Sequence, residues 1–212
     1  NTYGDFLVMS NQRSQMCVAC HELQGWQGSS HESSQASVTG AHDPYLKKGK
    51  YTTLADNGCQ SCHRPHSAGG AERLLHFRKS EDNCLSCHDG SVAMANIRTA
   101  ISKPSAHDVR RYDAIHDITE SPLNMPLHVE CVDCHNPHSV QSAEEQAPVV
   151  NAAMRGITGI TISGNFASSV QNQYEVCFKC HGDNTDRVES KITRLITQTN
   201  TRIEFDPANP SY

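Results

Sequence analysis

Residues 59–66 read Cys-Gln-Ser-Cys-His-Arg-Pro-His, and residues 84–88 read Cys-Leu-Ser-Cys-His. The same spacing returns at residues 17–21, 131–135 and 177–181, so five C-x-x-C-H patterns use all ten cysteines of the chain. This pattern is the attachment signature of c-type haem. Its two thiols bond the two vinyl groups on one edge of the porphyrin, and the histidine that follows offers its imidazole to the iron. The sequence therefore predicts five covalently attached haem c groups.

Each pattern supplies two attachment cysteines and one proximal iron ligand. The predicted attachment residues are Cys17, Cys20, Cys59, Cys62, Cys84, Cys87, Cys131, Cys134, Cys177 and Cys180. The predicted proximal ligands are His21, His63, His88, His135 and His181.

Other uses of paired cysteines fit this pattern less well. Disulfides need no histidine after each pair, and zinc sites use paired C-x-x-C units, for which five is an odd number. A redox-active C-x-x-C normally occurs once, within a thioredoxin-like pattern that this chain lacks.

The composition indicates that the chain has too few apolar side chains to fill a core by themselves. Only 36% of the 212 residues are hydrophobic and 6% are aromatic, with a mean hydropathy of −0.57. Bound porphyrins would take the place of the missing apolar side chains. With about 42 residues per haem, the polypeptide forms only a thin layer around the porphyrins. The net charge of −5 provides no basic field for nucleic acid, and no apolar run approaches a membrane span. The start at Asn1 without Met favours a mature, exported product.

The sixth iron positions are expected to be closed by histidine. Eight of the 13 histidines are not used as proximal ligands, which exceeds the five that are needed, although five methionines offer an alternative ligand. Bis-histidine ligation predicts low potentials and irons without an open position, whereas a Met ligand would raise the potential. The six favoured distal candidates, of which one is in excess, are His31, His42, His66, His107, His128 and His138. His76 and His116 rank lower because both lie among charged residues.

His66 and His138 share one local pattern. Each is the last residue of a His-x-Pro-His stretch whose first residue is a proximal histidine, so each lies three residues after that ligand. One helical turn separates the two imidazoles, so the second projects beside its own haem. We expect each of these residues to ligate a neighbouring haem.

The chain carries an internal repeat. A single-haem segment at residues 1–55 precedes doubled C-x-x-C-H repeats at 56–100 and 101–185, and a β-prone tail follows at 186–212. The alternating Ile and Thr residues within an insertion at 143–174 predict a short strand or hairpin. We expect a single, mostly irregular pentahaem domain, with short helices at the haem motifs and a few short strands, wrapped around a stacked haem chain. The tail forms a strand on its own subunit or contacts a second subunit.

Three stretches carry a resemblance to a known family. They read Cys84-Leu-Ser-Cys-His-Asp-Gly-Ser-Val-Ala, His128-Val-Glu-Cys-Val-Asp-Cys-His-Asn-Pro-His138 and Tyr174-Glu-Val-Cys-Phe-Lys-Cys-His-Gly-Asp. Over about residues 55–185 the chain resembles the doubled-CXXCH multihaem c-type cytochromes, which include subunits of extracellular cytochrome filaments. The resemblance implies a haem chain that continues through a homopolymer. It also implies one haem ligated from the adjacent subunit, with His31 or His42 as the donor.

These features predict electron transfer and no enzymatic activity. The expected partners are further copies of the chain in a head-to-tail polymer, other multihaem cytochromes and extracellular electron acceptors, with no nucleic acid and no membrane span. The expected location is the cell surface or the extracellular space, reached through the periplasm. One alternative is a soluble periplasmic pentahaem shuttle that docks on a reductase. Another is a multihaem enzyme of the nitrite or hydroxylamine type, which would need a five-coordinate haem.

Overall fold

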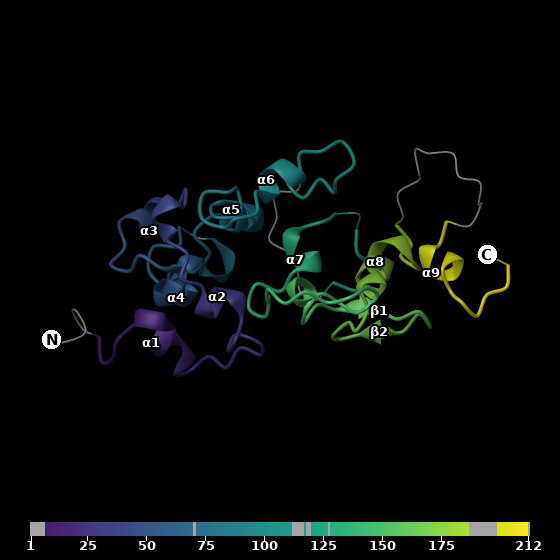
Figure 1. Ribbon diagram of the computed structural model, residues 1–212, viewed down its shortest axis with the longest axis horizontal. Coiled ribbons are helices and arrows are strands. Elements are labelled where there is room, and N and C mark those ends of the chain that lie inside the picture. The colour runs from purple at the N-terminus through teal and green to yellow at the C-terminus, as the bar shows by residue number, and fades with distance from the viewer. Residues whose placement is uncertain are drawn as a thin grey trace. The chain divides into compact units, whose positions relative to one another are not determined.

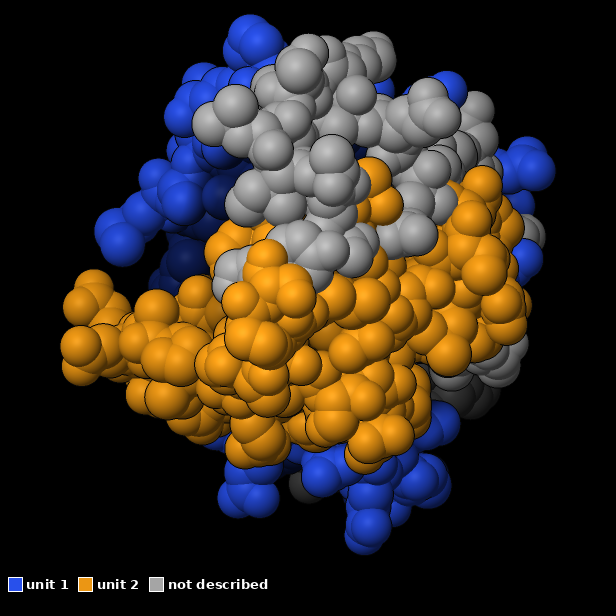
Figure 2. All heavy atoms as spheres, turned by 90° about the vertical axis from the view of Figure 1, so that its right-hand side faces the viewer, with its two compact units in different colours: residues 1–116, 129–131, 137–140 blue, residues 117–128, 132–136, 141–212 orange. Residues whose placement is uncertain are grey.

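The computed structural model describes residues 7–69, 71–111, 117, 120–126, 128–186 and 199–211. The chain divides into two compact units, which Figure 2 shows in different colours. Unit 1 comprises residues 1–116, 129–131 and 137–140, and unit 2 comprises residues 117–128, 132–136 and 141–212. Figure 1 shows short helices joined by long irregular connections, which confirms the predicted fold class.

Unit 1 is built from single helical turns. Its α-helices are α1 (Gln15–Val18), α2 (Ser30–Ser33), α3 (Pro44–Lys47), α4 (Leu54–Asn57), α5 (Ser80–Leu85) and α6 (Ile97–Ala100). Its 3-10 turns are η1 (Gln12–Ser14), η2 (Val38–Gly40), η3 (Gly58–Ser61) and η4 (Glu72–Leu74). The helix α7 (Cys131–Cys134) begins in unit 1 and ends in unit 2.

Side-chain caps start several of these turns. The Ser29 hydroxyl accepts from the Glu32 N–H at 3.1 Å to start α2, and the Asp43 carboxylate accepts from the Tyr45 N–H at 2.7 Å to start α3. The buried side chains of unit 1 include a small cluster of Val38, Ala41 and Leu46. Caps therefore define these short helices more than a continuous apolar face does.

Unit 2 is organised around its longest described helix, α8 (Gln173–His181). Asn172 and Glu175 form a capping box at its start. The unit also holds η5 (Ala152–Met154), α9 (Thr201–Glu204) and an antiparallel pair of β1 (Gly159–Ile160) and β2 (Phe166–Ala167). The core cluster consists of Val150, Ile157, Val170 and Val176.

The β pair packs on α8 through a position that requires glycine. A Cβ atom on Gly159 would collide with the Val170 side chain and with the Glu175 carbonyl. The register pairs Gly159 with Ala167 and Ile160 with Phe166. The hairpin predicted within 143–174 is thus confirmed.

The tail differs from its predicted β character. Residues 199–211 are described and contain the helical turn α9, whereas residues 187–198 lie outside the described part. The Asn200 side chain accepts from the Ile203 N–H at 3.3 Å, so a local cap outweighs the β propensity of the tail here. His116 and residues 1–6 also lie outside the described part. Over the ranges given above, no helix is long and apolar enough to cross a membrane.

Candidate haem sites

All five C-x-x-C-H motifs fold as helical turns, as predicted. In the first three motifs the histidine N–H donates to the carbonyl of the first cysteine at 2.9 Å, as in His63 to Cys59. The second cysteine donates to the same carbonyl at 3.2 Å. The fourth motif begins in α7 and the fifth lies within α8. This turn brings the two thiols and the imidazole of each motif together because they stand three and four residues apart.

Thiols of consecutive motifs interact with one another. These pairs are Cys17 with Cys59, Cys62 with Cys87, Cys84 with Cys131, and Cys134 with Cys180. First cysteines meet between motifs one and two and between motifs three and four. Between motifs two and three and between motifs four and five, the second cysteines are near enough to influence each other electrostatically. Within unit 1 these interactions place the first three motifs and Cys131 in sequence order, and within unit 2 they place Cys134 of the fourth motif near Cys180 of the fifth.

The surroundings of five of the thiols favour the protonated form by raising their pKa. Burial raises the pKa of Cys62 to about 12 and that of Cys180 to about 11. Burial also raises the pKa of Cys17 and Cys87, and a hydrogen bond from Cys84 raises that of Cys131. Redox-active and zinc-binding cysteines require the opposite shift, because the thiolate is the nucleophile and the ligand. The surroundings of these thiols fit attachment to haem better than thiolate chemistry.

Two proximal histidines are oriented by main-chain carbonyls. His63 Nδ1 lies 2.7 Å from the Arg73 carbonyl oxygen, and His135 Nδ1 lies 2.9 Å from that of Ala153. A carbonyl can only accept, so Nδ1 carries the proton and Nε2 keeps its lone pair. Ligating histidines are held in this way in metal sites. His21 and His181 are exposed at the ends of their motifs.

The distal candidates fall into two groups. His31 lies near His88, and His138 lies near His63, with ring centroids 6.1 Å and 6.2 Å apart. Burial lowers the pKa of His138, which favours the neutral imidazole that an iron needs.

The other distal candidates are placed differently. His42 Nε2 lies 2.7 Å from Asp89 Oδ2, and His128 Nε2 lies 3.1 Å from Glu120 Oε2. His66 and His107 are exposed.

His76, which the sequence ranks lower, has the surroundings of a ligand. Its side chain is buried, its Nδ1 pairs with the Asp43 carboxylate, and its Nε2 is buried without a hydrogen-bond partner. A carboxylate behind one ring nitrogen is typical of metal-ligating histidine. Sequence reasoning missed this because Asp43 lies 33 positions away and no local motif joins the two residues.

A buried ion pair connects the fourth and fifth motifs. Lys179 Nζ donates to the Asp133 carbonyl oxygen at 2.5 Å and lies 3.9 Å from Asp133 Oδ1. Each residue stands directly before the second cysteine of its motif. The pair therefore holds α7 and α8 against each other beside Cys134 and Cys180.

The described tail is attached next to the fifth motif. Arg202 Nε lies 2.6 Å from Asp183 Oδ2, and Arg202 Nη2 lies 2.9 Å from Asp183 Oδ1. Asn200 Nδ2 donates to Asp183 Oδ1 at 2.6 Å, and Asp183 follows His181 by two residues. The tail thus holds in place, through Asp183, the loop that follows the fifth motif.

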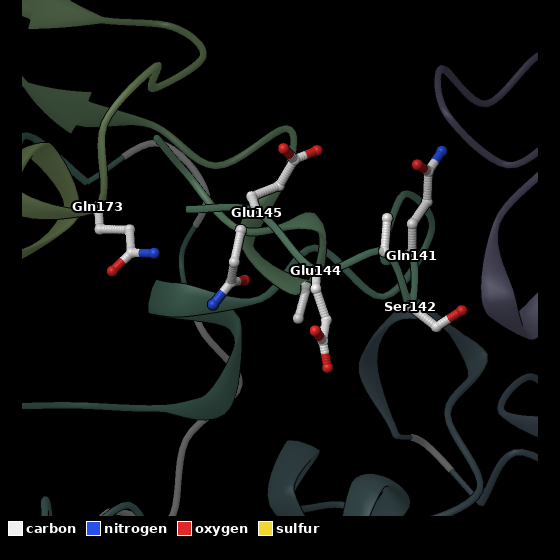
Figure 3. Close-up of a pocket in the computed structure, with 8 residues that line it drawn as sticks. Gln141, Ser142, Glu144, Glu145 and Gln173 are labelled. Carbon is white, nitrogen blue, oxygen red and sulfur yellow. The ribbon is translucent and has the colours of Figure 1, made fainter. Parts of the chain in front are cut away.

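A shallow hollow of about 410 Å³ in unit 2 includes Ala153, the residue whose carbonyl holds His135. Gln141, Glu144, Glu145 and Gln173 also line it. Figure 3 shows that these labelled side chains spread apart and do not converge on one point. The hollow therefore does not assemble a catalytic group.

Comparison with known proteins supports the haem interpretation. Residues 52–93 match the family model of the doubled CXXCH motif. The multihaem cytochrome MtrA of Shewanella baltica (strain OS185) is 26% identical over 187 residues, which cover 86% of this chain and 36% of the relative. The chain thus spans about a third of the length of that protein. No solved structure matches the chain. Together with the motifs, these findings support the interpretation of the chain as a multihaem c-type cytochrome with distant similarity to MtrA.

Proposed function

We propose that this chain carries five c-type haems and conducts electrons along them in the order of their motifs, as the repeating subunit of an extracellular filament. The observation that carries the proposal is the set of interactions between thiols of consecutive motifs, which include hydrogen bonds for Cys17 with Cys59 and Cys84 with Cys131. Neighbouring attachment edges favour porphyrins that lie close to one another. Bound haem supplies an iron that accepts and releases one electron, with a potential that its axial ligands and surroundings tune.

The residues of the chain fit a bound haem, and their role would be to attach it and to orient its iron ligands. Partly buried thiols with a raised pKa, such as Cys62 and Cys180, would take the attachment bonds, and His63 and His135 present Nε2 because their Nδ1 atoms are hydrogen-bonded. The buried Nε2 of His76 offers a further ligand. With two histidines at each iron, no position stays open for a substrate, which favours electron transfer over catalysis.

Two exposed apolar side chains that lie far apart in the sequence are candidates for the contact between copies of the chain in a filament. Val8 is 87% exposed and Phe205 is 67% exposed. Covering each of these side chains in an interface between copies would remove apolar surface from water, which favours association. In a head-to-tail polymer, further copies of the chain would cover them.

Negative-stain electron microscopy of the natively secreted protein tests the filament. The proposal predicts long uniform fibres that retain haem absorbance. We expect Phe205→Asp to abolish the fibres while the haem content stays unchanged. Ser105→Asp is the control, because it adds the same charge at an exposed polar position, removes no apolar side chain and should leave the fibres intact. Discrete small particles from the unaltered protein would overturn the filament and favour a diffusible shuttle.

A further inference from the structure

We infer that the structure assigns two of the five axial ligand pairs. His31 and His88 ligate the haem on Cys84 and Cys87, while His138 and His63 ligate the haem on Cys59 and Cys62. The inference rests on the proposed function, because it requires bound haems, and it deepens that function by naming the ligands of the two central sites of unit 1.

The spacing of the rings is the first support. The His31 and His88 centroids are 6.1 Å apart with an interplanar angle of 63°, and the His63 and His138 centroids are 6.2 Å apart at 14°. A metal bonded to two facing imidazole nitrogens at about 2 Å each holds the ring centroids roughly 6 Å apart. Both observed centroid distances agree with the spacing that two imidazoles bonded to one iron would have.

The free nitrogens are the second support. His31 Nδ1 donates to the Pro137 carbonyl oxygen at 2.9 Å, and His63 Nδ1 donates to the Arg73 carbonyl oxygen at 2.7 Å. Both bonds fix the tautomer that leaves the Nε2 lone pair available. One member of each pair is thus oriented as a ligand by the main chain.

Main-chain and side-chain contacts also bring the segments of the two distal ligands together. The Ser30 N–H donates to the Val140 carbonyl oxygen at 2.8 Å. Gly25, at a φ of +85°, packs so closely on Ser139 that a Cβ atom there would collide with it. The Trp26 ring meets His138 edge-on, with centroids 6.4 Å apart. These contacts tie the segment of His31 to the segment of His138.

The consequence concerns how the doubled motif at residues 59–88 is completed. Its two proximal histidines lie inside that stretch, whereas both assigned distal ligands come from outside it, His31 from the front segment and His138 from after the fourth motif. The central haem pair then becomes six-coordinate only when the flanking segments have folded onto it.

Binding of carbon monoxide to the reduced, fully haem-loaded chain tests this assignment. A closed bis-histidine iron does not take up the gas, so the unaltered protein should bind none. His31→Gly and His138→Gly should each open one iron, bind one CO per chain and give one high-spin haem by electron paramagnetic resonance. Added imidazole should restore the low-spin spectrum, which shows that the variants remain folded.

Backgrounds that lack one haem identify the iron. In a Cys84→Ser, Cys87→Ser chain, His31→Gly should open no further iron, whereas in a Cys59→Ser, Cys62→Ser chain it should still open one. His138→Gly should open no further iron in the Cys59→Ser, Cys62→Ser chain and should still open one in the Cys84→Ser, Cys87→Ser chain. An additional CO site with His31→Gly in the first background would overturn its pairing with His88.

Two more observations distinguish a wrong ligand assignment from a failure of the proposed function. If a background chain does not mature, His31→Met in the full chain gives a methionine-ligated haem. Nuclear Overhauser contacts of its methyl group must then reach the haem on Cys84 and Cys87, and contacts with any other haem overturn the assignment. Uptake of CO by the unaltered chain would instead contradict the closed irons of the proposed function.

Discussion

The buried Lys179–Asp133 pair allows a quantitative prediction for the contact between the fourth and fifth motifs. Lys179→Met keeps the length of the side chain and removes its charge, which leaves a buried Asp133 carboxylate without this cation. At the observed 3.9 Å, Coulomb's law with an effective dielectric constant of ~20 gives about 4 kcal/mol. Removing one partner of a buried pair typically costs a similar ~3–5 kcal/mol.

Guanidinium unfolding of the haem-loaded chain, followed through the haem absorbance, measures this loss. A cost of about 4 kcal/mol lowers the unfolding midpoint by roughly 1 M if the denaturant slope is ~4 kcal/mol per M. Lys103→Met, at an exposed lysine, is the control and should change stability by less than ~0.5 kcal/mol. The double variant Asp133→Asn, Lys179→Met should recover most of the loss. Equal midpoints for Lys179→Met and Lys103→Met would refute the reasoning.

Three further predictions concern the tail, a buried carboxyl and the core. Arg202→Met should free the tail from Asp183 and cost about 1–2 kcal/mol locally, seen as faster hydrogen exchange over residues 199–211; unchanged exchange would contradict this attachment. Burial raises the folded-state pKa of Glu81, so stability should fall as pH rises from ~4.3 through that raised value. Glu81→Gln should remove the fall, and urea unfolding at several pH values checks this. Phe178→Ala, at a fully buried side chain of α8, should cost roughly 3–5 kcal/mol in the same assay, and a loss under ~1 kcal/mol would contradict its burial.

Much of the fold was predictable because the cysteine spacing constrains it locally. A histidine four residues after the first cysteine forms a helical turn wherever the motif occurs, as it does from Cys17 onwards. Alternating Ile and Thr between glycines likewise predicted the β1–β2 pair. The tail was less predictable, because the Asn200 cap acts on three residues and outweighs a β propensity spread over many.

The histidines show where local patterns stop being informative. No spacing relates His31 to His88 or His63 to His138, since tertiary contacts bring these rings together. His76 ranked low because charged neighbours in sequence suggested an exposed position, whereas its side chain is buried against Asp43. Ligand choice depends on which nitrogen is held and which is free, and this is a property of the folded chain.

The five covalent haems are the premise of the whole account, and the intact mass of the denatured, purified protein tests them most directly. Thioether bonds survive denaturation, so the account predicts one species with the mass of the polypeptide plus five haems. A species with fewer haems, or a polypeptide mass lowered by disulfide formation, would contradict it.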